Sequence, residues 1–225
     1  MALLGSGVLA IWNGIDPEAE ADFVAWHVRE HIPERVALAG FLRGRRYVAL
    51  DGEPAYFNFY ETESPAALTM PVYLARLNEP TPWTQRVVKH FRDTSRTVCD
   101  VVASLGVGEG GVMETIRLRV PGNAADFAVA SGEMLRSIAA APGVVAVHLL
   151  RGRRQDSAGG SAEKALRSQP DEVADWILLI EAVGPEAVKA ARGTVASAAA
   201  LQRCGVAPGC RRGLYRLQFA LSRAT

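Results

Sequence analysis

Strand-like and helix-like hydrophobic patterns follow one another in the same order twice along the chain. In the first pass, short β-rich runs alternate with segments whose apolar residues recur every three to four positions. The predicted strands are Val8–Ile15, Phe41–Leu50, Ala55–Glu61 and Ser95–Ser104, and the predicted helices are Glu18–His31 and Ser64–Leu77, with a short amphipathic stretch from Trp83 to Phe91. This order is strand, helix, strand, strand, helix, strand.

The second pass repeats that order after a glycine-rich junction at Gly106–Gly111. Its predicted strands are Val112–Val120, Val144–Arg151, Asp175–Val183 and Leu214–Leu221, and its predicted helices are Ala124–Ala140 and Pro185–Arg203. Residues 1–107 and 108–225 therefore form two predicted repeats. The second differs by a polar Gly/Ser insertion at about 155–173, where the first has a tight turn.

The first predicted helix carries clear boundary signals. Asp16 can cap its start, and Pro17 suits its first turn. Pro33 is expected to end it, which places His31 in the last turn.

Each βαββαβ unit puts both of its helices on one face of an antiparallel sheet, so the other, apolar face needs a cover. The sister repeat can provide it. The predicted fold is α+β, with two ferredoxin-like repeats whose sheets pack face to face.

Composition limits the partners. Of the 225 residues, 49% are hydrophobic and 22% charged, and the formal net charge is +1. With positive and negative charges so nearly equal in number, the chain has no overall electrostatic field that would attract nucleic acid or an anionic membrane. No apolar run reaches the roughly 20 residues that span a bilayer. Its three cysteines fit neither a disulfide framework nor a paired metal site. We expect a cytoplasmic monomer or homodimer.

One local motif narrows the fold further. Trp26-His27-Val28-Arg29-Glu30-His31-Ile32-Pro33, followed by Ala39-Gly40-Phe41, resembles the EthD-type pattern of the dimeric α+β barrel superfamily, although Ala39 stands where a proline is usual. The second repeat keeps Pro142-Gly143 but has no His-x-Pro. The resemblance implies a pocket between a sheet and its helices. It leaves the chemistry open, because the superfamily includes cofactor-free monooxygenases, isomerases, cyclases, dehydratases and haem enzymes.

His31 is the leading catalytic candidate, because histidine titrates near neutral pH and can transfer protons without a cofactor. The alternative is that His31 caps the end of its helix or simply packs there. Trp26, the aromatic residue of the motif, is a predicted substrate contact.

The first hairpin is the second candidate region. Strand alternation places Arg43, Arg45 and Tyr47 on one side of their strand. On the partner strand it groups Tyr56, Asn58 and Tyr60. If both groups share a sheet face, Tyr56 and Tyr60 can assist catalysis while Arg43, Arg45 and Asn58 bind the substrate. The alternative is that the arginines pair with acids across the interface of the repeats.

Two metal-based alternatives are weaker. His27, Glu30 and His31 spell the His-x-x-Glu-His of inverzincin proteases, but in a small βαβ context. His148 lies in an apolar strand and is conceivable as a haem ligand. The sequence thus favours an enzyme without metal or cofactor that performs proton transfer, or monooxygenation, on a small hydrophobic or aromatic compound. A haem-binding relative and a non-catalytic binding module are the alternatives.

Overall fold

The computed structural model describes residues 3–167 and 169–224, within which eight antiparallel strands close into one barrel. The strands are β1 (Gly7–Ile15), β2 (Phe41–Asp51), β3 (Tyr56–Thr62), β4 (Phe91–Gly106), β5 (Val112–Leu118), β6 (Val144–Gly152), β7 (Trp176–Ala182) and β8 (Arg211–Ser222). Their order around the barrel is β1-β3-β2-β8-β5-β7-β6-β4.

That order contains two ferredoxin-like sheets, β4-β1-β3-β2 and β8-β5-β7-β6. The edge strands of the two sheets also pair, β2 with β8 and β4 with β6. The predicted fold of two ferredoxin-like repeats is confirmed. Edge pairing closes the barrel, so no strand edge is left without a partner among the described residues.

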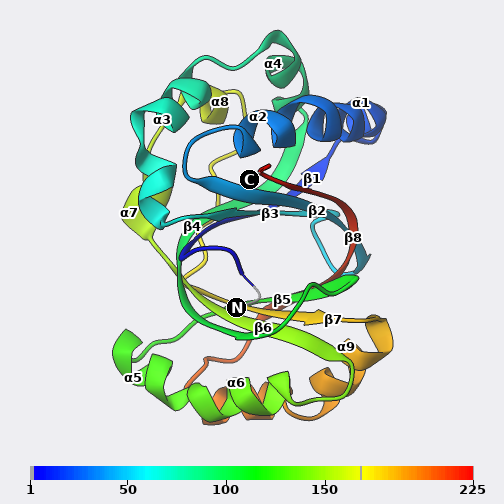
Figure 1. The fold of residues 1–225 in the computed structure, drawn as a ribbon, viewed down its shortest axis with the longest axis vertical. Coiled ribbons are helices and arrows are strands. Elements are labelled where there is room, and N and C mark those ends of the chain that lie inside the picture. The colour runs from blue at the N-terminus through cyan, green and yellow to red at the C-terminus, as the bar shows by residue number, and fades with distance from the viewer. Residues whose placement is uncertain (1–2, 168, 225) are drawn as a thin grey trace.

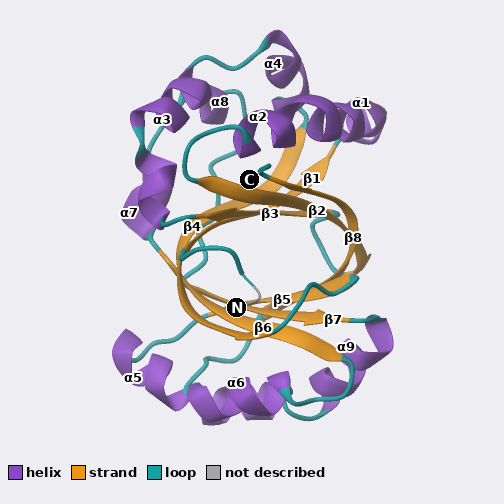
Figure 2. Ribbon diagram, viewed as in Figure 1, coloured by secondary structure: helices purple, strands orange, loops and turns teal. Residues whose placement is uncertain are grey.

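Helices cover the outside of the barrel in two layers, one against each sheet (Figures 1 and 2). The first repeat contributes α1 (Glu20–Trp26), α2 (Ile32–Val36), α3 (Pro71–Asn78) and α4 (Pro82–Val88), with single-turn segments at Pro17–Ala19 and Pro65–Thr69. The second contributes α5 (Ala124–Ala130), α6 (Gly132–Ala139), α9 (Pro185–Gly193) and α10 (Ala198–Arg203).

The polar insertion of the second repeat lies over the first repeat. It forms α7 (Arg154–Ala158) and α8 (Ala162–Ala165), and α8 contacts α3 and α4 while α7 contacts β4. Figure 1 shows both helices on the side of α3 and α2, far from α5 and α6. A segment that the repeat assigns to one half therefore covers the other.

The first long helix does not end at Pro33, contrary to the sequence prediction. It passes through a π-helical segment, His27–His31, and continues as α2 to Val36. The Ile32 amide bonds the His27 carbonyl five residues back. This wider turn accommodates a proline that lacks the amide needed for regular α-helical bonding.

Asp16 does not cap this helix. Its carboxylate accepts hydrogen bonds from Arg92 and pairs with His90 instead, and its side chain makes no capping bond. Pro17 does occupy the first turn, as expected. The ion pair with β4 fixes the start of the helix from the neighbouring strand.

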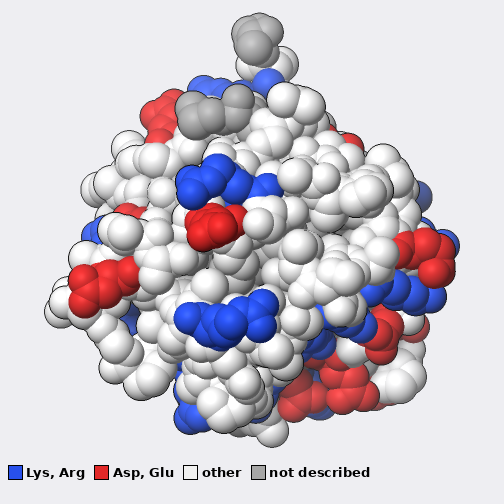
Figure 3. All heavy atoms as spheres, turned by 90° about the horizontal axis from the view of Figure 1, so that it is seen from below, with Lys and Arg blue, Asp and Glu red and all other residues white. Residues whose placement is uncertain are grey.

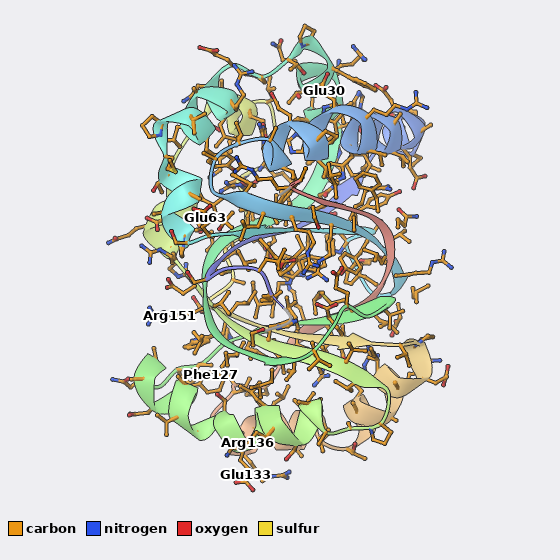
Figure 4. All side chains as sticks on the ribbon, viewed as in Figure 1. Glu30, Glu63, Phe127, Glu133, Arg136 and Arg151 are labelled. Atoms are coloured by element: carbon orange, nitrogen blue, oxygen red, sulfur yellow. The ribbon has the colours of Figure 1, made fainter. Side chains whose placement is uncertain are left out.

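The two helix-covered layers differ in chemistry. The second repeat's layer is an apolar core in which Phe127 points from α5 toward the sheet (Figure 4) and packs edge-on against Trp176. The first repeat's layer includes buried histidine, asparagine and arginine side chains. Burial of so many polar groups in one layer indicates that the candidate functional site lies in the first repeat.

The outer surface below α5, α6 and α9 carries interspersed charges of both signs on a largely uncharged background (Figure 3). No helix among the described residues is long and apolar enough to cross a membrane.

Candidate functional site

The centre of the polar layer is a pair of buried imidazoles on the π-helical segment. The rings of His27 and His31 stack with centroids 5.5 Å apart, and Trp26 lies 4.3 Å from His31. Because the helix continues to Val36, His31 lies in its interior, so the capping alternative is wrong, whereas the packing alternative agrees with its burial. A π-helical segment at this place is typical of functional sites, because the wider turn shifts side chains out of regular register. We call Trp26, His27, His31, Asn58 and Tyr60 the histidine layer.

Both imidazoles are held neutral. Burial lowers the pKa of His27 well below its ordinary value, and Arg46 lowers it further. Burial also lowers the pKa of His31, with added repulsion from Arg35, His27 and Arg167. At neutral pH each ring therefore has one nitrogen free to accept a proton.

The β3 side chains form the floor beneath these rings. The Tyr60 hydroxyl lies 3.3 Å from His27 Nε2, and the rings of Tyr60 and His31 meet edge-on. The Asn58 amide donates to Asn13 Oδ1 at 2.8 Å. Tyr56 lies farther along the strand, where its hydroxyl donates to Glu20. The structure thus brings His31, Trp26 and Tyr60 together, whereas the Tyr56 hydroxyl bonds Glu20 and its ring belongs to an apolar cluster that it shares with Trp26.

Unsatisfied polar atoms gather around the histidine layer. Of the twelve buried side-chain nitrogen and oxygen atoms without a hydrogen-bond partner among the described residues, seven lie on this side of the first sheet. They are His27 Nδ1, His31 Nδ1, Arg46 Nε and Nη2, Asn58 Oδ1, Arg167 Nε and Asp171 Oδ2. A buried group without a partner is costly, so such a concentration indicates a site arranged for a ligand rather than for stability.

Positive charge surrounds this region. The Arg46 guanidinium lies 4.7 Å from the Tyr56 ring centroid and 5.3 Å from that of Phe23. Arg96, fully buried, donates to the Tyr73 hydroxyl at 2.7 Å. These cations favour an anion formed within the layer.

The polar insertion of the second repeat contributes side chains to the same region around the histidine layer. Arg35 on α2 pairs with Glu163 on α8 at 2.8 Å, and both side chains are buried. Arg167, which follows α8, lies over the Phe91 ring and pairs with Glu163 and Asp171. Residues from the second repeat therefore complete the first repeat's site.

The hairpin arginines do not join this layer, so the prediction of one shared face is wrong. The register sets Arg45 opposite Phe59 and Arg46 opposite Asn58, which turns Arg43 and Arg45 into the barrel. There Arg43 pairs with Glu61, and Arg45 pairs with Glu61 and with Glu181 of the second repeat. The alternative prediction, that these arginines pair with acids across the interface of the repeats, is correct for Arg45. Arg46 is the arginine on the tyrosine side.

His148 belongs to this barrel network. Its Nδ1 lies 3.0 Å from the Ser104 hydroxyl and its Nε2 lies 3.2 Å from Glu181. Burial raises the pKa of Glu181, but the hydrogen bond from His148, the charge of Arg45 and the hydrogen bond from the Gly110 amide lower it to about 2. Since both nitrogens of His148 are engaged, this ring does not fit the role of axial haem ligand.

The zinc-protease motif is not assembled. Glu30 lies on the outer side of its helix, toward α4 (Figure 4), where it accepts a hydrogen bond from Thr81. Among the described residues, the one group of three side chains close enough to hold a metal is Asp16, Glu18 and His90, and Asp16 is already paired with Arg92.

Several residues of this region were missed by the sequence prediction. Arg46 and Arg96 each lie two positions from a valine, Val48 and Val98, that faces the helices, so strand alternation could have placed them on this face. No local sequence pattern predicts the burial of Arg35 and Arg167, because it depends on the insertion of the second repeat lying over the first repeat.

Comparison with known proteins identifies a fold. No protein-family model and no curated protein matches the chain. An anthrone oxidase-like protein superposes with a TM-score of 0.69 at 17% identity, covering 97% of this chain and 93% of that one. A candidate monooxygenase of Fusobacterium nucleatum gives 0.63 at 11% identity, with 98% and 96% covered. A heme-binding protein from Thermus thermophilus gives 0.50 at 11%, with 96% and 92% covered.

At these identities the likeness concerns architecture alone. It agrees with the strand order and defines this protein as a dimeric α+β barrel contained in one chain.

Proposed function

We propose that this protein is a small-molecule enzyme that removes a proton from an apolar aromatic ketone in the histidine layer, without a metal or organic cofactor. The observation that carries the proposal is the pair of buried, neutral imidazoles whose Nδ1 atoms have no partner among the described residues. Trp26 and the stacked rings suit a flat aromatic body. The resemblance of Trp26–Pro33 to the EthD-type motif supports the same assignment.

Each residue of the site has a separate role in the proposed proton transfer. His31 Nδ1 accepts the proton that leaves a carbon conjugated with the carbonyl through the aromatic rings, which in anthrone is the methylene carbon. Burial raises the pKa of Tyr60 far above its ordinary value, so its hydroxyl stays protonated and can donate a hydrogen bond. The charges of Arg35, Arg46 and Arg167 stabilise the resulting enolate. An enolate next to His31 also raises the pKa of that ring, which offsets the effect of burial during the transfer.

Anthrone is the substrate we choose to test, because a structural neighbour is named anthrone oxidase-like. Once deprotonated, anthrone can react with O2. Its methylene carbon loses two hydrogens and gains one oxygen atom, and the second oxygen atom leaves as water, so the products are anthraquinone and water.

The assay follows anthraquinone absorbance and O2 uptake with purified protein in air. We expect saturable turnover that falls at least about a hundredfold in His31→Gln, the scale of a lost general base. His90→Gln, which removes a partly exposed histidine paired with Asp16, serves as the matched control. Binding of anthrone without turnover would favour a non-catalytic binding module, and absence of binding would refute the proposal.

Haem binding is the alternative that the name of the Thermus thermophilus protein suggests. The residues present do not fit it. Both nitrogens of His148, the candidate axial ligand, are engaged by Ser104 and Glu181. Titration with haemin should therefore leave the Soret band of free haemin unshifted, and a saturable shift that is lost in His31→Gln would overturn this conclusion.

A further inference from the structure

A separate cavity lies at one end of the barrel. Its volume is about 1000 Å³, and its walls come from the ends of β1, β2 and β5, the starts of β4 and β8, and the insertion. We call it the barrel mouth. None of the histidine-layer residues lines it, so we treat it as a different site.

Three arginines line the barrel mouth, and one of them, Arg212, is already paired with Glu114. Arg117 lies at the end of β5, largely buried, with its guanidinium 5.0 Å from the ring centroid of Trp12. Arg211 lies at the start of β8 and is largely exposed. Both also line a neighbouring cavity of about 350 Å³, together with Arg119 and Arg154. The two cavities therefore meet at a pair of cations.

A carboxylate of the chain itself bridges these cations. Glu172 lies 2.7 Å from Arg211 and 3.7 Å from Arg117. Its backbone is fixed to β4, because its amide donates to the Thr94 carbonyl and its carbonyl accepts from the Arg96 amide. Its side chain is 59% exposed, so it can swing away without disturbing the backbone. An external anionic group would therefore bind where the Glu172 carboxylate now lies, between the two arginines.

The remaining walls define the rest of the ligand. Ala49, Pro54 and Ala55 give an apolar side, while Glu53 and Asp93 disfavour a second negative charge. A cavity of this size accommodates a drug-sized molecule.

We propose that the barrel mouth binds an organic monoanion with an apolar body, whose carboxylate or sulfonate displaces the Glu172 side chain from Arg117 and Arg211. The apolar body then contacts Ala49, Pro54 and Ala55. Glu172 acts as an internal competitor that weakens binding until a ligand of the right shape replaces it.

The test uses 8-anilinonaphthalene-1-sulfonate, a fluorescent monoanion with an apolar body. We expect saturable binding of one molecule per chain to the folded protein. Glu172→Gln should tighten binding, and Arg211→Gln should weaken it about tenfold, the scale of one charge-assisted hydrogen bond. Arg117→Gln should weaken it similarly.

Two control variants test whether the dye binds at the barrel mouth rather than elsewhere on the protein. Arg216→Gln removes an exposed arginine of the same strand that lines neither cavity, and His31→Gln alters only the histidine layer. Both should bind as the parent does. Weaker binding in Glu172→Gln, unchanged binding in Arg211→Gln, or absence of saturable binding in the parent would overturn the proposal. If Arg117→Gln does not fold, the exposed Arg211 decides the result.

Discussion

Acidification from pH 7.5 to 5.5 should destabilise this protein through His27 and His31. Both rings are buried, and their pKa values lie well below the ordinary 6.5, chiefly because burial disfavours the imidazolium. In the unfolded chain each histidine protonates near pH 6.5. Below that pH the unfolded state binds more protons than the folded state, so the free energy of unfolding falls as pH falls.

The size of the effect follows from the same linkage. Over this window each histidine reduces the free energy of unfolding by at most about 1.4 kcal/mol, and the pair by at most about 2.7 kcal/mol, the limit reached when both rings stay neutral in the folded protein down to pH 5.5. That is a large part of a typical stability of about 5–15 kcal/mol. Glu181 does not interfere, because its pKa is lowered to about 2 and its stabilising contribution is lost only below about pH 4.5.

Urea denaturation followed by circular dichroism at pH 7.5, 6.5 and 5.5 measures this loss. The double variant His27→Gln/His31→Gln should lose up to about 2.7 kcal/mol less than the parent across the window. Because His148 is retained in every variant, the comparison isolates the pair. An equal loss in parent and double variant would show that the imidazoles are not held neutral in the folded state.

Three further outcomes follow from the geometry. The kcat/KM for anthrone should keep its acid limb below pH 6.5, because His31 needs to be neutral and its pKa is lowered; a limb at or above 6.5, read from the pH–rate profile, contradicts this. Glu181→Gln should cost about 3 kcal/mol in urea denaturation, since it removes a charge that pairs with buried Arg45. Phe127→Ala should cost about 3–4 kcal/mol by the same measurement, yet leave the kcat for anthrone unchanged, because this ring packs in the apolar layer of the second repeat.

The sequence by itself determined the order of the elements. Alternation of period two and recurrence of about 3.6 residues are properties of single segments, so strands such as β1 and β7 lie close to their predicted positions. The same local chemistry singled out Trp26 and His31 in one helix. It also indicated that the two repeats differ, since only the first carries the His-x-Pro motif.

Only the tertiary structure decided which side chains meet. Alternation groups the residues of one strand, but the register between strands determines which groups share a face, and a shift of one residue exchanges the faces. The pairing of Arg46 with Asn58 placed Arg43 and Arg45 in the barrel, where Arg45 meets Glu181 from the other repeat. The path of the insertion over the first repeat likewise depended on contacts between residues far apart in the chain, such as Arg35 with Glu163. These long-range contacts are settled by packing and charge compensation in three dimensions, which no local pattern encodes.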